Sequence, residues 1–178
     1  MIILTALKEE IPTLHKEDNV FVTGLGKVNA AMFATKLILE HTPDLVINFG
    51  TAGSISDDIM HGLVECTGFI QRDMDCSPLG FRKYTTPFEE DGDLIGTSEI
   101  VCGTGDSFLM DAGNLPSEGV HIVDMEAYAI AKVCRHLHVP FRCFKYISDK
   151  ADENADKDWN TFEHTNAEQL FLKKLSTL

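Results

Sequence analysis

The chain has few positive charges. It carries 15 lysines and arginines against 28 aspartates and glutamates, and its formal charge is −13 over 178 residues. Because a nucleic-acid site needs basic surface, this balance argues against a polynucleotide ligand, and an anionic membrane surface is disfavoured for the same reason. No apolar run approaches the length of a membrane span, and the apolar N-terminus lacks the basic region and cleavage site of a signal peptide. We therefore expect a cytoplasmic protein with no membrane and no nucleic-acid partner.

The sequence also lacks the patterns of a disulfide framework or a metal site. Its five cysteines are odd in number and none form a Cys-x-x-Cys pair, which is typical of free thiols in a reducing cytosol. These are Cys66, Cys76, Cys102, Cys134 and Cys143. The seven histidines include no His-x-x-x-His pair. Asp73 and Asp75 are spaced like metal ligands, but a solvated loop is the favoured interpretation. We predict no metal and no cofactor.

Strand and helix patterns alternate along a chain that has no repeat, low-complexity tract or linker. Residues 1–178 are therefore expected to form one domain of the α/β class. Apolar and β-branched runs predict strands at residues 2–6, 45–49, 62–70, 98–103 and 141–147. Helical spacing predicts helices from the glycine turn at 24–26 to about residue 41, over 127–137, and from about 159 to 175.

The most informative stretch is residues 121–152, where a helix and a strand adjoin two carboxylates. Apolar side chains at helical spacing predict one buried face, through Ala127, Ile130, Cys134 and Leu137. Pro140 ends this helix, and a strand follows directly. Glu126 is expected just inside the helix and Asp149 just past the strand, at the sheet edge where α/β proteins bind ligands. The competing interpretation of Asp149 is an N-cap or loop aspartate.

Two motifs in this stretch resemble a known pair. Asp-Met-Glu-Ala at 124–127 and Ile-Ser-Asp-Lys-Ala-Asp at 147–152 are similar to the signature of the purine nucleoside phosphorylase/uridine phosphorylase superfamily. The match is closest to its methylthioadenosine/S-adenosylhomocysteine nucleosidase family. It extends over nearly the whole chain, although the chain is shorter than a usual member and Asp124 replaces a glutamate. The resemblance implies a three-layer αβα sandwich around a mixed central sheet, and a small purine nucleoside as ligand.

The resemblance also assigns catalytic roles. Cleavage of an N-glycosidic bond needs an acid for the leaving purine, a base for water and an acceptor for the ribose hydroxyls. The family pattern gives these roles to Asp149, Glu10 and Glu126, in that order. Met125 would pack against Glu126, and Ser148 would orient Asp149. From the residues alone, Glu10 is interpreted as an acidic side chain in a first helical turn, favoured by the helix dipole.

Further pocket residues follow from matching motifs, and the family places them around the nucleoside. They are Leu25, Thr51, Gly53, Phe108, Leu109 and Trp159. Phe108 would stack on the purine while the backbone of Leu109 binds the base edge, and Thr51 keeps the hydroxyl of the family's serine. Without the resemblance, Phe108 is by default a core residue and Trp159 packs a helix onto the body.

Hydrolysis is favoured over phosphorolysis. Phosphorolytic relatives place arginines around an anion pocket, one of them just before the glycine turn at 50–53. Here that strand ends in Asn-Phe-Gly, and a carboxylate at Glu10 would repel phosphate. We predict hydrolysis of an adenine nucleoside such as 5′-methylthioadenosine or S-adenosylhomocysteine. The alternatives are a phosphate-dependent phosphorylase and a non-catalytic nucleoside-binding protein.

The segment at 76–88 is expected to be a surface loop, yet it is rich in apolar side chains. They are Pro78, Leu79, Phe81, Tyr84, Pro87 and Phe88. Exposed aromatic residues commonly mark a contact between proteins. The resemblance implies that this segment caps the 5′ pocket of a neighbouring subunit. We therefore predict a homodimer whose interface lies beside the active site.

Overall fold

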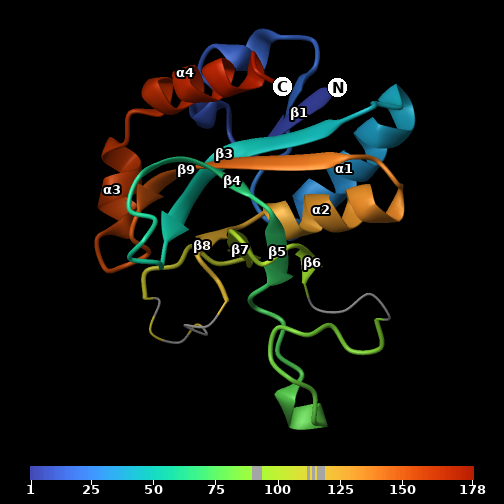
Figure 1. The fold of residues 1–178 in the computed structure, drawn as a ribbon, viewed down its shortest axis with the longest axis vertical. Coiled ribbons are helices and arrows are strands. Elements are labelled where there is room, and N and C mark those ends of the chain that lie inside the picture. Colours follow the sequence, from blue (N-terminus) through green and yellow to red (C-terminus); the bar gives the residue numbers. More distant parts are fainter. Residues whose placement is uncertain (90–93, 112, 114, 116–118) are drawn as a thin grey trace.

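A mixed sheet runs through the middle of the molecule (Figure 1). The computed structural model describes residues 1–89, 94–111, 113, 115 and 119–178. Nine strands of these residues pair in the order β2-β1-β3-β8-β7-β5-β6, with β9 between β3 and β4. The bounds are β1 Ile2–Thr5, β2 Val20–Val22, β3 Val46–Ser54, β4 Gly62–Cys66, β5 Gly68–Gln71, β6 Ile95–Gly96, β7 Val101–Thr104, β8 Ile122–Asp124 and β9 Phe141–Asp149.

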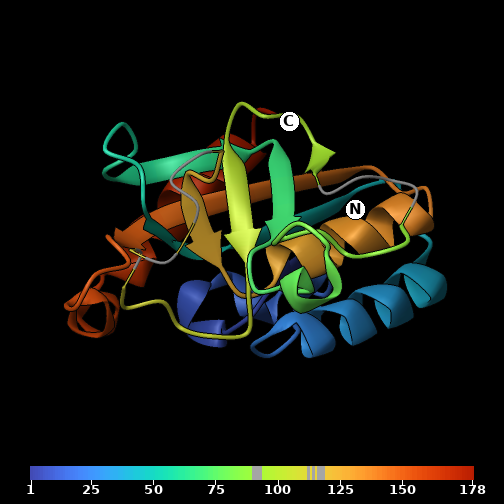
Figure 2. The ribbon, with the colours of Figure 1, turned by 90° about the horizontal axis from the view of Figure 1, so that it is seen from below.

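Helices cover both faces of this sheet. The α-helices of the described residues are α1 Lys27–His41, α2 Ala127–His136, α3 Ala155–Thr161 and α4 His164–Leu175. Short 3₁₀ turns, η1 Lys8–Glu10, η2 Leu14–Lys16 and η3 Ser77–Leu79, lie in the connections. Figure 2 shows α1 and α2 together on one side of the strands and α4 on the other. The predicted three-layer αβα sandwich is confirmed.

The alternation of side chains along β1 explains the layers. Leu4 belongs to the core cluster that α1 and α2 cover, whereas its neighbour Ile3 belongs to the cluster that α4 covers. Successive residues of a strand point to opposite faces, so a strand that is apolar throughout must be covered on both sides. The second cluster includes Phe171 of α4, whose ring stacks on Phe49 with centroids 4.2 Å apart.

Several predicted element boundaries are wrong. Residues 62–70 form two strands because the chain changes partner at Thr67: β4 pairs with β9, and β5 pairs with β7. The backbone N–H of Thr67 instead donates to the carbonyl of Ile100 at 2.9 Å. The last predicted helix is two helices, since Phe162 between them is extended, with φ −67° and ψ 137°. The strand predicted at 98–103 begins only at Val101.

Two further differences bear on the site. The strand predicted at 45–49 continues to Ser54, because β9 and β8 pair with it beyond the predicted end. Glu126 is the N-cap of α2 rather than a residue inside the helix, and Asp149 is the last residue of β9 rather than the one beyond it. The helix itself ends as predicted, before Pro140.

Candidate active site

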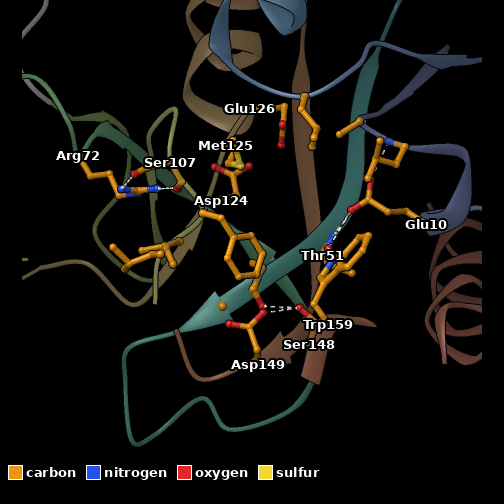
Figure 3. Close-up of a pocket in the computed structure, with 18 residues that line it drawn as sticks. Glu10, Thr51, Arg72, Ser107, Asp124, Met125, Glu126, Ser148, Asp149 and Trp159 are labelled. Carbon is orange, nitrogen blue, oxygen red and sulfur yellow. Dashed lines mark hydrogen bonds between the residues drawn. The ribbon is translucent and has the colours of Figure 1, made fainter. Parts of the chain in front are cut away.

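The carboxyl ends of several strands meet around one cavity of about 260 Å³ (Figure 3). All eleven predicted site residues line it: Glu10, Leu25, Thr51, Gly53, Phe108, Leu109, Met125, Glu126, Ser148, Asp149 and Trp159. The structure therefore brings together side chains from the two ends of the chain. It also adds lining residues that the sequence did not predict, namely Ala6, Leu7, Ala52, Arg72, Ser107, Val123 and Asp124.

Glu10 lies just after β1 and is held by four hydrogen bonds. One oxygen, Oε2, accepts from the Thr5 hydroxyl at 2.9 Å and from the backbone N–H of Leu7 at 3.2 Å. The other, Oε1, accepts from the Thr51 backbone N–H at 2.7 Å and from its hydroxyl at 2.9 Å. The indole N–H of Trp159 donates to the same hydroxyl at 3.0 Å. This carboxylate is fixed in position, with β3 and α3 both contributing to the arrangement.

Asp149 ends β9 and is 8% exposed. Its Oδ2 accepts from the Ser148 hydroxyl at 2.8 Å, and its Oδ1 accepts from the Ala151 backbone N–H at 2.8 Å. Burial raises the pKa of Asp149 above its ordinary value, against the opposing effect of these two hydrogen bonds. Gly53 faces it closely, because a Cβ there would lie 2.6 Å from Oδ1. The carboxyl group is thus fixed in position at the end of β9, with its pKa raised by burial.

Glu126 is the third of the predicted carboxyl groups, and the cavity is also lined by a fourth, Asp124. Its Oε1 accepts from the backbone N–H of Gly26 at 2.9 Å, which links α2 to the turn before α1. Gly26 has a φ of 89°, a left-handed backbone conformation that glycine adopts without strain. Burial, followed by the charge of Asp124, raises the pKa of Glu126 to about 8. In its protonated form this carboxyl group can both donate and accept hydrogen bonds.

A buried ion pair that the sequence analysis missed lies beneath these carboxyl groups. Lys145 is 1% exposed, and its Nζ lies 2.8 Å from Oδ2 of Asp124. Burial alone would raise the pKa of Asp124, but the Lys145 ammonium holds it below its ordinary value. A Cβ on Gly50 would lie 3.3 Å from Nζ and 3.0 Å from Oε1 of Glu10, so both groups approach this glycine closely. The available signal was a lysine inside the apolar strand 141–147.

Arg72 was also missed, and it holds the turn that precedes Phe108. Its guanidinium donates to the Ser107 hydroxyl at 3.2 Å, to the Gly105 carbonyl at 3.3 Å and to the Ser107 carbonyl. Phe108 itself is 47% exposed and lines the cavity, so its default interpretation as a core residue is wrong. The arginine is 5% exposed and gives this side of the cavity its positive charge.

The Asp-x-Asp pair binds protein groups. Asp73 forms an ion pair with Lys27 and accepts from the Asp106 backbone N–H at 2.9 Å. Asp75 accepts from the Ser77 backbone N–H at 2.9 Å and lies 3.4 Å from the Lys83 ammonium. Among the described residues, no group of three or more His, Cys, Asp or Glu side chains is placed to hold a metal ion.

Other proteins share both the sequence pattern and the fold. A model of the phosphorylase superfamily matches residues 11–178. A 5′-methylthioadenosine/S-adenosylhomocysteine nucleosidase of Exiguobacterium sp. is 34% identical over 167 residues, covering 80% of this chain and 72% of that protein. The nucleosidase of the same name from Anoxybacillus flavithermus is 31% identical over 164 residues, covering 79% of this chain and 71% of that protein.

Solved structures show the same fold at lower identity. The nucleosidase from Neisseria meningitidis, in complex with methylthio-immucillin-A, has a TM-score of 0.86 at 23% identity and covers 99% of this chain and 98% of that one. Helicobacter pylori futalosine hydrolase has a TM-score of 0.85 at 23% identity, with 99% and 97% covered. The chain belongs to the phosphorylase superfamily and, within it, to the 5′-methylthioadenosine/S-adenosylhomocysteine nucleosidase family.

Proposed function

We propose that the protein hydrolyses the N-glycosidic bond of an adenine nucleoside such as 5′-methylthioadenosine or S-adenosylhomocysteine. The observation that carries this proposal is the arrangement of the Glu10, Glu126 and Asp149 carboxyl groups around one cavity. Figure 3 shows Glu10, Glu126 and Asp149 approaching that cavity from three different sides. Relatives at 31–34% identity are named nucleosidases for these two compounds.

Each carboxyl group has an environment suited to one task. The bond between C1′ and the purine nitrogen breaks through an oxocarbenium-like transition state, and the purine leaves with an added proton. Asp149, with its raised pKa, supplies that proton to N7 of the purine. Glu10 orients a water molecule and accepts its proton as the oxygen bonds to C1′. Glu126, whose pKa is raised by burial, binds the ribose hydroxyls and aligns the sugar.

The charges of the cavity favour water over phosphate as the nucleophile. Among the described residues that line the cavity, Arg72 is the one cation, and its guanidinium already donates to Gly105 and Ser107. The nearby Lys145 is paired with Asp124. A phosphate ion placed beside Glu10 would meet a carboxylate, whereas Figure 3 shows Arg72 on the opposite side of the cavity. A non-catalytic nucleoside-binding protein would need neither the acid nor the base.

Purine release should not depend on phosphate. The purified protein, mixed with 5′-methylthioadenosine in phosphate-free buffer, is expected to release adenine and a 5′-substituted free ribose at an undiminished rate. Chromatography of both products, with and without added phosphate, makes the measurement. A strict requirement for phosphate and a sugar 1-phosphate product would identify a phosphorylase, and tight binding without release would identify a binding protein.

We further propose that the protein acts as a homodimer in the cytoplasm. The cytoplasmic assignment is supported by its five free cysteines. In Figure 1 the segment around η3 projects from the body of the molecule. On it, Leu79 and Phe88 are 76% and 92% exposed, and the Phe81 and Phe88 rings meet edge to face at 5.2 Å. Apolar surface of this kind on a projecting loop favours a contact with a second copy.

Phe81→Asp should weaken the dimer and raise the Michaelis constant together, because the same loop would contact the partner and cap its 5′ pocket. Light scattering at micromolar concentration gives the mass, and steady-state kinetics gives the coupling. Lys83→Ala is the matched control, since it removes only an exposed ion pair with Asp75. A fully active wild-type monomer would refute the proposal. A dimer whose kinetics ignore the Phe81 change would leave assembly standing and remove its link to the site.

A further inference from the structure

One buried carboxylate lies outside the cavity and has no part in the proposed chemistry. Glu168, in α4, is 1% exposed. It accepts from the Thr13 backbone N–H at 2.9 Å, from the Thr13 hydroxyl at 2.8 Å and from the Leu14 backbone N–H at 2.6 Å. A buried charge is costly unless hydrogen bonds replace its lost hydration, and here backbone and hydroxyl donors do so. The carboxylate is therefore committed to this one segment.

The segment that Glu168 binds is the start of η2. The first N–H groups of a helical turn have no partner within the turn, and a side-chain oxygen commonly accepts from them. Thr13 occupies the N-cap position but makes no capping bond with its own side chain. Glu168 supplies that acceptor from the other end of the chain. The C-terminal helix thereby fixes the connection between β1 and β2.

That connection carries Glu10. Between Glu10 and Thr13, the side chain of Ile11 is fully buried in the core cluster that contains Ala167 and Phe171 of α4. Figure 1 shows α4 beside this N-terminal segment. Glu10 is thus anchored at one end by β1 and at the other by an apolar and a polar contact with α4. A displacement of the segment would move the carboxylate relative to Thr51 and the cavity.

We propose that Glu168 is a positioning residue for Glu10, the base of the reaction. This inference rests on the proposed hydrolytic function. Glu168 does not line the cavity and acts only through the segment from Ile11 to Leu14. Orienting a catalytic group is worth up to about a hundredfold in rate for a displacement of about 1 Å. An effect on turnover is therefore expected without an effect on nucleoside affinity.

A double-mutant cycle between Glu168 and Glu10 tests the proposal. Glu168→Gln keeps the shape, but its amide nitrogen replaces one of the two accepting oxygens. It should lower kcat about tenfold and leave KM within about twofold. In a Glu10→Gln background the same change should cause no further fall, because the group that it positions is already inactive. Glu163→Gln is the control, because that side chain is exposed at the N-cap of α4, where it accepts a hydrogen bond from Asn166.

The outcomes separate this inference from the proposed function. If the wild type is active and Glu168→Gln lowers kcat equally in both backgrounds, the positioning role alone is overturned. The same holds if Glu168→Gln does not lower kcat at all. A wild type that releases no purine overturns both proposals. If Glu168→Gln does not fold, Thr13→Ala removes a single donor to the carboxylate, and the same dependence on Glu10 is expected with a smaller fall in kcat.

Discussion

Replacing Asp149 with asparagine should lower kcat by roughly two to four orders of magnitude, the usual scale for loss of a general acid. Asparagine keeps the shape and can still accept from the Ala151 backbone N–H, as the carboxylate does at 2.8 Å. Its amide can donate a hydrogen bond but is too weak an acid to transfer a proton to the purine. Nucleoside binding should therefore be largely kept, and KM should change little.

The pH dependence of kcat gives the second half of this test. Burial raises the pKa of Asp149, so the protonated acid persists to higher pH than an ordinary aspartic acid would. In the wild type, kcat should fall as the pH rises through the raised pKa of Asp149. The residual activity of Asp149→Asn should lack this fall. Asp57→Asn, at an exposed position in the loop after β3, is the control. If the kcat of Asp149→Asn lies within tenfold of the wild-type value, Asp149 is not the general acid.

The local pattern of the sequence was sufficient where a contact is local. The spacing of Ala127, Ile130 and Cys134 predicted α2, and all three side chains are buried. The break at Thr67 was not predictable in this way, because it arises when the chain exchanges β9 for β7 as its partner. Neither partner is near in sequence. Strand ends that depend on pairing with distant segments cannot be predicted from the local pattern of residues.

The site shows the same division. Glu10, Glu126 and Asp149 were found because each lies in a short motif. Their hydrogen-bond partners were mostly not found, apart from Ser148, which is adjacent to Asp149 and bonds it as predicted. The contact of Glu10 with Thr51 joins distant segments. The roles of all eleven predicted residues remain predictions, although the structure places them around one cavity.

Lys145 illustrates what the sequence could not supply. Lysine is rarely buried without a partner, so its place in an apolar strand indicated that a carboxylate lies opposite. The strand pattern does not say which one. The partner of Lys145 is Asp124, the last residue of β8. It comes within reach because β3 pairs with both β8 and β9. The interaction is set by the sheet order, and the sheet order was not available from the residues alone.

Lys145→Met should lower the free energy of unfolding at pH 7 by about 3–5 kcal/mol, the usual cost of removing one partner of a buried ion pair. Methionine fills similar space but leaves the Asp124 charge with only the Thr104 hydroxyl and the Ala127 backbone N–H. Urea unfolding measures the loss. Lys150→Met, a change at the exposed residue that directly follows β9, is the control and should stay within about 0.5 kcal/mol.

The double variant Lys145→Met/Asp124→Asn separates the charge from the packing. It removes both charges and keeps an oxygen that can accept from Ala127, so a large part of the lost stability should return. The pH dependence has a definite sign. The wild-type pair depresses the pKa of Asp124, so its stabilising contribution is present above the ordinary aspartate pKa and is lost as the pH falls through the folded value. The penalty of Lys145→Met should accordingly shrink in acid, where Asp124 is protonated. If the free energy of unfolding of Lys145→Met at pH 7 lies within about 1 kcal/mol of the wild-type value, the expected cost of leaving Asp124 unpaired is contradicted.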